Sequence, residues 1–179
     1  MFLSGFVDQT FKKLKTQTAN LITISNLSLG GFAIISILHN QLHLSLILIF
    51  VAALTDRFDG MVARKLNIES ELGKQLDSMS DIISFGIAPA LLLYTAALSQ
   101  FDFPGMFFTI FYLACGAYRL ARFNISENDG YFTGLPITAA GCFLTLFYLA
   151  IPFVSDVLIL CMTITLSVLM VSPFTLKKM

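Results

Sequence analysis

Long apolar runs separated by short polar connections fill most of the chain. A membrane-spanning helix needs about 20 mainly apolar residues, and the chain supplies about this length six times. The predicted spans cover residues 21–39, 42–65, 73–98, 104–123, 134–153 and 157–174. The pattern therefore predicts an all-α integral membrane protein with six transmembrane helices.

The segment ahead of the first predicted span has a different periodicity. Polar residues such as Asp8 and Lys12 lie opposite a set of apolar residues at helical spacing: Phe2, Leu3, Phe6, Val7, Phe11 and Leu14. This pattern indicates an interfacial amphipathic helix at 1–18, followed by a six-helix membrane domain at 19–179. A cleaved signal peptide is disfavoured, because no small-residue cleavage site follows the apolar run.

Composition agrees with a lipid environment. The 179 residues are 56% hydrophobic and 12% charged, whereas soluble domains carry about 25% charged residues. Mean hydropathy is +0.82. The net charge is zero, so nucleic acid is not an expected partner. The three cysteines lie far apart within apolar runs, which is typical of packing residues rather than of a zinc site or a disulfide framework.

The distribution of cations predicts the orientation. Short cytoplasmic connections retain Lys and Arg, and all eleven cations fall before span one, around connections two and four, or after span six: Lys12, Lys13, Lys15, Arg57, Arg64, Lys65, Lys74, Arg119, Arg122, Lys177 and Lys178. Both termini are therefore predicted to be cytoplasmic. With no transit segment recognised, we expect a multi-pass protein of a prokaryotic cell (plasma) membrane, with its active site at the cytoplasmic face.

Four aspartates lie inside otherwise apolar segments. Asp56 and Asp59 come late in the second predicted span, and Asp77 and Asp81 come early in the third. An ionised carboxylate in a bilayer costs at least about 2.5 kcal/mol, so these groups need partners. Because only residues 66–72 join the two spans, the helices should be antiparallel neighbours. The four carboxylates should then converge at the cytoplasmic end.

Divalent cations would stabilise such a cluster. A ligand set made of oxygen atoms favours Mg²⁺, Mn²⁺ or Ca²⁺ over zinc, and four carboxylates balance the charge of two such ions. Two metals about 3.5–4 Å apart are a recurrent device for displacement at phosphorus. An internal salt-bridge network is the alternative, and it is disfavoured because few cations are embedded in the predicted spans. The sequence therefore predicts two divalent cations as cofactors.

The acids belong to a longer motif. Residues 56–81 read Asp-x2-Asp-Gly-x2-Ala-Arg-x8-Gly-x3-Asp-x3-Asp. This motif resembles the complete signature of the CDP-alcohol phosphatidyltransferase family, with every fixed position filled. Further stretches at 23–30, 77–89, 119–124 and 134–136 are most similar to the membrane-embedded phosphatidylserine synthases of that family.

The resemblance implies an activity. Members transfer a phosphatidyl group from CDP-diacylglycerol to an alcohol and release CMP, and the serine branch uses L-serine. Homodimerisation is also implied. By the same resemblance, the four aspartates ligate two metals and Asp81 is also the general base. Gly60, Ala63 and Arg64 are implied to lie against the cytidine nucleotide.

Two further residues are candidates for the nucleotide pocket. Gly73 continues the stripe of small residues beside the acids, where a ligand can approach the backbone closely; tight helix packing is an equally good explanation. Asn26, in the first span, could line the pocket, and an interhelical hydrogen bond explains it almost as well.

Three polar residues at the cytoplasmic end of the fourth span are candidates for the acceptor or phosphate site: Arg119, Arg122 and Asn124. Arginine binds carboxylate or phosphate through two hydrogen bonds, and asparagine offers both a donor and an acceptor. Cations that only set the topology at the headgroup level are an equally good explanation.

Two rival functions stay open. The same chemistry could use glycerol 3-phosphate or inositol phosphate as acceptor, with Arg119 and Arg122 binding the extra phosphate. A divalent-cation transporter would also carry intramembrane carboxylates. Transport is disfavoured, because the acids gather at the cytoplasmic ends of the spans and the outer halves are apolar.

Overall fold

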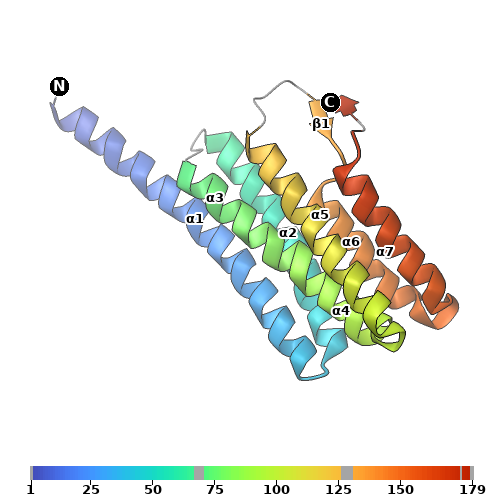
Figure 1. The fold of residues 1–179 in the computed structure, drawn as a ribbon. Helices are drawn as coiled ribbons and strands as arrows, with labels where there is room; N and C mark the ends of the chain where they lie inside the picture. The colour runs from blue at the N-terminus through green and yellow to red at the C-terminus, as the bar shows by residue number, and fades with distance from the viewer. Residues whose placement is uncertain (1, 67–70, 126–130, 174, 178–179) are drawn as a thin grey trace.

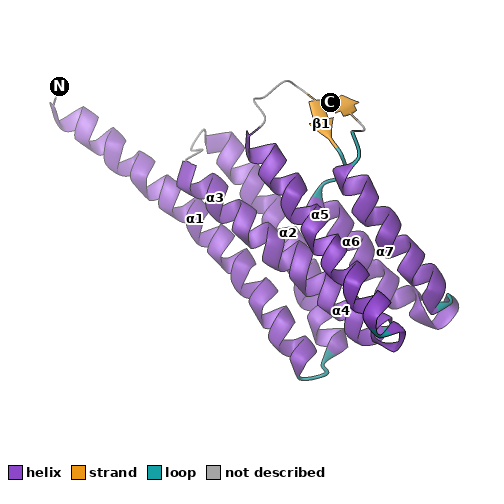
Figure 2. Ribbon diagram, viewed as in Figure 1, coloured by secondary structure: helices purple, strands orange, loops and turns teal. Residues whose placement is uncertain are grey.

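The computed structural model describes the backbone of residues 2–66, 71–125, 131–173 and 175–177. Side chains are described for these residues except 2–16, 18–19, 59–60, 62–66, 131–133 and 175–177. Helices dominate the described chain and run up and down in one bundle (Figures 1 and 2). The α-helices are α1 (Phe2–Leu38), α2 (Leu42–Leu66), α3 (Glu71–Asp81), α4 (Ala88–Ala96), α5 (Phe103–Ile125), α6 (Ile137–Ala150) and α7 (Asp156–Val171).

Three shorter helical segments extend or join these helices. The π-helix η1 (Ile82–Ile87) links α3 directly to α4, and two 3₁₀ segments follow α4 and α6 as η2 (Leu98–Phe101) and η3 (Ile151–Phe153). Each predicted span overlaps one of these helices, except that the third overlaps α3, η1 and α4 in succession and the fifth overlaps α6 and η3. The helical fold is therefore confirmed.

The described helices differ in length and hydropathy. Two helical segments among the described residues are long and apolar enough to cross a bilayer, Asn20–Leu38 and Glu71–Ala96. Ile137–Phe153 and Asp156–Val171 are shorter apolar helices. These features are consistent with a membrane protein. Six membrane crossings stay a prediction.

The all-α prediction is incomplete at one point. Strands β1 (Tyr131–Thr133) and β2 (Thr175–Lys177) pair antiparallel, with Phe132 opposite Leu176. They join the connection before α6 to the segment after α7. Each strand is only three residues long, and its partner is distant in the sequence, so no local periodicity could reveal the pair.

The N-terminal segment is helical, as predicted, but it does not end before the first span. Helix α1 continues from Phe2 to Leu38 without a break, and in Figure 1 its first turns extend beyond the rest of the bundle. No Gly or Pro occurs between Phe6 and Leu29 to interrupt it. The contact of residues 1–18 with a membrane surface stays a prediction, because most of their side chains lie outside the described set.

The helices pack around two buried apolar clusters. Helix α1 lies against α2 and α3, α5 against α7, and α4 against α6. The larger cluster includes Phe85, Tyr112, Leu144 and Ile159, and the smaller one joins α1, α2 and α4 around Ile49. Many large apolar side chains, such as those of Phe32, Phe107 and Leu158, are exposed on the outside. A surface of this kind is suited to lipid contact.

Candidate metal centre

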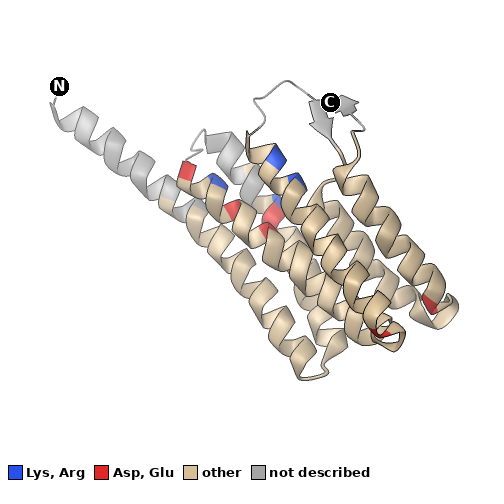
Figure 3. Ribbon diagram, viewed as in Figure 1, with Lys and Arg blue, Asp and Glu red and all other residues tan. Residues whose placement is uncertain are grey.

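Three of the four predicted acids come together in the structure. Asp77 and Asp81 lie one turn apart on the same face of α3, and Asp56 faces them from α2. One carboxylate oxygen from each residue can be chosen so that all three atoms lie within 4.8 Å of one another. Figure 3 shows this acidic group at the end of the bundle where the described Lys and Arg residues also lie.

The motif continues along α2 beyond Asp56. Asp59, Gly60, Ala63 and Arg64 belong to α2, but their side chains lie outside the described residues. Asp59 follows Asp56 by three residues, so the helix backbone places it on the neighbouring turn. Its role as a fourth ligand stays a prediction.

The environment of Asp81 is the most constrained of the three acids. Its Oδ1 atom is buried and has no hydrogen-bond partner among the described residues. Asp56 and Asp77 lie close enough to repel its charge, and Arg119 attracts it. A buried carboxylate oxygen without a donor is unfavourable. A divalent cation bound by oxygen ligands would satisfy this atom and offset the repulsion, so the residues present fit such an ion.

The two predicted arginines on α5 have different surroundings. The Arg119 side chain is half-buried and interacts with Asp81. Its Cζ atom lies 5.6 Å from the ring centroid of Phe123, and its buried Nε has no hydrogen-bond partner among the described residues. Arg122, three residues later, is exposed. The structure therefore brings Arg119, but not Arg122, to the acids.

Asn124 connects the end of α5 to α3. Its Nδ2 donates to Ser78 Oγ at 2.9 Å, and Lys74 Nζ donates to its backbone oxygen at 3.3 Å. Ser78 directly follows Asp77 in the chain. The Asn124 amide nitrogen is thus engaged in an interhelical contact that holds α5 against the acid-bearing helix.

Asn26 lies deeper, on α1 where this helix meets η1. It is 1% exposed, its backbone oxygen accepts a hydrogen bond from Ser84 Oγ at 3.1 Å, and its Oδ1 has no partner among the described residues. The interhelical bond here therefore uses the Asn26 backbone rather than its side chain. Gly73 lies half-buried on α3, one turn before Asp77.

Two serines near the acids were assigned no role from the sequence. Ser80 and Ser84 are buried, and their hydroxyls donate to the backbone oxygens of Thr23 at 3.4 Å and Asn26 at 3.1 Å. Their spacing of four residues places both on the face of the third span that meets α1. In the sequence, the signal for this interhelical contact was a pair of small polar residues four positions apart within an apolar run.

Comparison with known proteins adds independent information. The model of the CDP-alcohol phosphatidyltransferase family matches residues 16–171. The CDP-diacylglycerol–serine O-phosphatidyltransferase of Bacillus subtilis is 43% identical over 122 residues, which cover 68% of this chain and 69% of that protein.

Archaeal proteins are similar as well. The archaetidylserine synthase of Methanothermobacter thermautotrophicus is 40% identical over 157 residues, covering 86% of this chain and 66% of that protein. The CDP-diacylglycerol–serine O-phosphatidyltransferase of Methanocaldococcus jannaschii is 40% identical over 126 residues, covering 70% of this chain and 57% of its own length. The matched regions thus span about half to two thirds of these two relatives. Because the family match extends over most of the chain and includes the acid motif, the chain belongs to the CDP-alcohol phosphatidyltransferase family of enzymes.

Proposed function

We propose that the chain transfers the phosphatidyl group of CDP-diacylglycerol to the hydroxyl of L-serine, which yields phosphatidylserine and CMP. The observation that carries this proposal is the convergence of Asp56, Asp77 and Asp81 in a member of this family. Serine is the acceptor favoured by the relatives, because serine appears in the names of all three described above.

The acid cluster is suited to two divalent cations, Mg²⁺ or Mn²⁺, with Ca²⁺ as a further possibility. Asp56, Asp77 and Asp81 would hold them together with Asp59. When bound, such ions supply positive charge to the phosphate oxygens and to the departing CMP. The buried Oδ1 of Asp81, which has no partner among the described residues, supports this assignment.

Asp81 is proposed as the general base. A serine hydroxyl is a weak nucleophile near neutral pH, so a carboxylate within about 2.6–3.2 Å has to accept its proton. The proton moves to the Asp81 carboxylate while the serine oxygen forms a bond to the lipid-side phosphorus. The bond between that phosphorus and the oxygen of CMP breaks. Asp81 is the acid of the cluster that interacts electrostatically with both the other carboxylates and Arg119.

Arg119 is the residue best placed to bind the acceptor. Its guanidinium interacts with Asp81, and its Nε has no hydrogen-bond partner among the described residues. A guanidinium can bind the serine carboxylate through two hydrogen bonds. This would bring the serine hydroxyl toward Asp81. Arg122 and Asn124 are proposed as outer parts of the same site, and Gly60, Ala63, Arg64, Gly73 and Asn26 as the nucleotide side.

The arrangement in the membrane is proposed from the charges. The described Lys and Arg residues lie at the acid-bearing end of the bundle (Figure 3). Two acids lie at the starts of helices at the opposite end, because Asp102 directly precedes α5 and Asp156 begins α7. This distribution supports six crossings of a plasma membrane, with both termini and the active site at the cytoplasmic face. A homodimer remains the assembly expected from the family.

The proposal is tested with the purified chain in lipid nanodiscs. CDP-diacylglycerol, Mn²⁺ and one labelled acceptor are incubated, with L-serine, glycerol 3-phosphate and inositol phosphate in parallel. We expect a labelled lipid and CMP with serine alone, and complete loss of both when EDTA is added, with recovery on excess Mn²⁺. Absence of lipid product with serine would refute the proposal. Metal flux into proteoliposomes without CMP release would instead favour transport.

A second lipid donor is suggested by one relative. The archaetidylserine synthase is similar over 86% of this chain, and its name differs from the others in the lipid component. The same assay with a CDP-activated archaetidyl donor measures the preference. We expect CDP-diacylglycerol to give the higher kcat/KM, and the reverse ranking would change the assigned lipid but not the acceptor.

A further inference from the structure

We propose that Tyr112 is a positioning residue for Asp81, acting through the π-helical segment η1. Tyr112 lies on α5 and does not contact the acids directly. The activity measurement that tests this proposal rests on the proposed function. The ion-binding measurement rests on the acid cluster alone.

The backbone after Asp81 departs from α-helical hydrogen bonding. The π-helix η1 starts at Ile82, and at its end the amide of Ala88 donates to the oxygen of Ile83, five residues earlier. Pro89 has no amide hydrogen, so it cannot donate to the oxygen of Phe85, four residues earlier. A π-helical turn within an α-helix is uncommon and is frequently found at functional sites.

Tyr112 supplies the missing donor. Its hydroxyl donates to the Phe85 oxygen at 3.1 Å, and both residues are 0% exposed. A buried carbonyl without a partner is unfavourable, and Pro89 removes the ordinary helical partner. The hydroxyl of Tyr112 is therefore the group that stabilises the backbone of η1 on the α5 side.

Two other helices fix the same segment. On the α1 side, Ser84 Oγ donates to the oxygen of Asn26, and Gly30 packs against Ser84. On the α6 side, a Cβ atom at Gly141 would lie 2.5 Å from the Phe85 oxygen, so only glycine permits this approach. Of these contacts, the bond from Tyr112 is the one in which a side-chain hydroxyl donates to the Phe85 oxygen, and Tyr112→Phe removes it while keeping the ring.

The helical register of η1 sets the direction in which the acids point. A π-turn adds one residue relative to regular α-helix, and one residue corresponds to a rotation of about 100°. Helix α4 is held in the core through Leu92 and Leu93. If η1 lost the bond from Tyr112 and its register shifted, Asp77 and Asp81 would rotate relative to α4 and away from Asp56. The Tyr112 hydroxyl thereby keeps the three carboxylates together.

The test replaces the hydroxyl and keeps the ring. Tyr112→Phe is compared with wild type and with Tyr118→Phe, which removes a hydroxyl from a 58% exposed tyrosine on the same helix. Mn²⁺ binding is measured by EPR titration in nanodiscs, and CMP release is measured against serine concentration.

For Tyr112→Phe we expect about a tenfold increase in the Mn²⁺ dissociation constant and about a tenfold lower kcat, as for other residues that orient ligands. The KM for serine should change less than about twofold, and Tyr118→Phe should match wild type, because the proposed role concerns metal-ligand orientation alone.

A second variant separates positioning from stability. Pro89→Ala restores an amide that can pair with the Phe85 oxygen in α geometry. Added to Tyr112→Phe, it should recover thermal stability while Mn²⁺ binding stays weak, because the register of η1 is then wrong. Recovery of both stability and Mn²⁺ binding in the double variant would overturn the proposal. Wild-type Mn²⁺ affinity in Tyr112→Phe would overturn it as well.

These outcomes are distinct from failure of the proposed function. If the wild-type chain binds Mn²⁺ but releases no CMP from CDP-diacylglycerol, the transferase proposal fails and the EPR comparison of Tyr112→Phe still applies. If the wild type transfers phosphatidyl groups and Tyr112→Phe binds Mn²⁺ equally well, only the positioning role fails.

Discussion

The bundle differs in its polar groups between the two ends of helix α5. At the acid-bearing end, three buried side-chain atoms lack a hydrogen-bond partner among the described residues: Asn26 Oδ1, Asp81 Oδ1 and Arg119 Nε. At the opposite end, Phe103, Phe107 and Phe111 stack along the helix with centroid distances of 6.3 and 6.4 Å. Folded proteins rarely leave buried polar atoms unpaired, so their concentration at one end points to a ligand there.

Some small polar residues near the acids form hydrogen bonds between helices. In α6 and α7, Thr145, Thr163 and Ser167 each donate to a backbone oxygen four residues earlier in their own helix. Near the acids, Thr55 and Ser78 also donate within their own helices. Ser84 and Asn124 bond to other helices. Interhelical bonds fix the relative positions of helices, which bonds within one helix do not. The bonds of Ser84 and Asn124 therefore help to fix the helices around the acids.

The largest effect is expected from Asp81→Asn, which keeps the size of the side chain and removes the base. We expect kcat for CMP release to fall about 10²–10⁴-fold at saturating Mn²⁺. Asp77→Asn is the matched comparison, since it removes a proposed ligand that is exposed; raising Mn²⁺ should restore part of its activity. Full activity of Asp81→Asn would remove Asp81 as the base, and complete rescue by Mn²⁺ would reduce it to a ligand.

Much of the fold could be predicted from the sequence, because helix length and hydropathy are local properties. The boundaries of α2 and α5 agree with the predicted spans to within two residues. The π-turn η1 could not be predicted in this way. It depends on the Tyr112 hydroxyl from α5 and on the close approach of Gly141 from α6, and both contacts join segments that are distant in the sequence.

Part of the candidate site could also be predicted from the sequence. The convergence of Asp56 with Asp77 and Asp81 follows from a connection too short to separate the two helices. The different environments of Arg119 and Arg122 do not follow from sequence, because both lie at the same end of one helix. Their difference arises from the partial burial of Arg119, from its interaction with Asp81 and from the Phe123 ring under its guanidinium.

An intermediate effect is expected from replacing each arginine by lysine, which keeps the charge and removes the planar guanidinium. For Arg119→Lys we expect the KM for serine to rise about tenfold, which corresponds to about 1.4 kcal/mol and to the loss of a charge-assisted hydrogen bond. Arg122→Lys should stay within about twofold of wild type, because Arg122 is exposed and does not reach the acids. Initial rates of CMP release at varied serine concentration provide the measurement. A wild-type KM in both variants would show that both cations act only at the headgroup level, and equal increases in KM would place both in the acceptor site.

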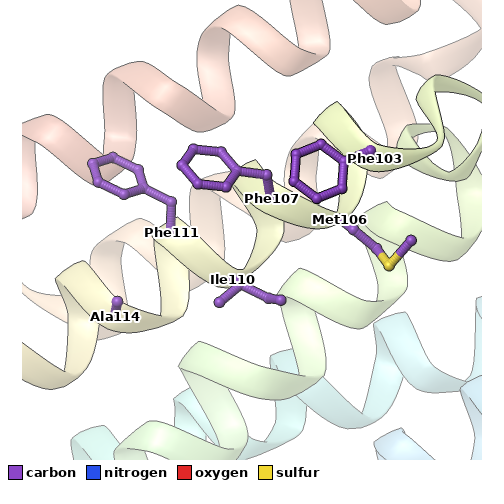
Figure 4. Close-up of a pocket in the computed structure, with 6 residues that line it drawn as sticks. All are labelled: Phe103, Met106, Phe107, Ile110, Phe111 and Ala114. Carbon is purple, nitrogen blue, oxygen red and sulfur yellow. The ribbon is translucent and has the colours of Figure 1, made fainter.

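The smallest effect is expected at the apolar end of α5. Phe107 is 51% exposed and lines a shallow apolar pocket with other residues of the same helix (Figure 4): Phe103, Met106, Ile110, Phe111 and Ala114. It precedes Arg119 by twelve residues, or about 18 Å along the helix.

Phe107→Leu keeps this surface apolar and removes no polar contact, so the stability should change by less than about 0.5 kcal/mol. The kcat should stay within about twofold of wild type, since no group near the acids changes. Thermal unfolding and CMP release in nanodiscs measure both quantities. A tenfold loss of activity would show that catalysis extends to this end of the bundle, and the contrast between the two ends of α5 would then no longer mark the site.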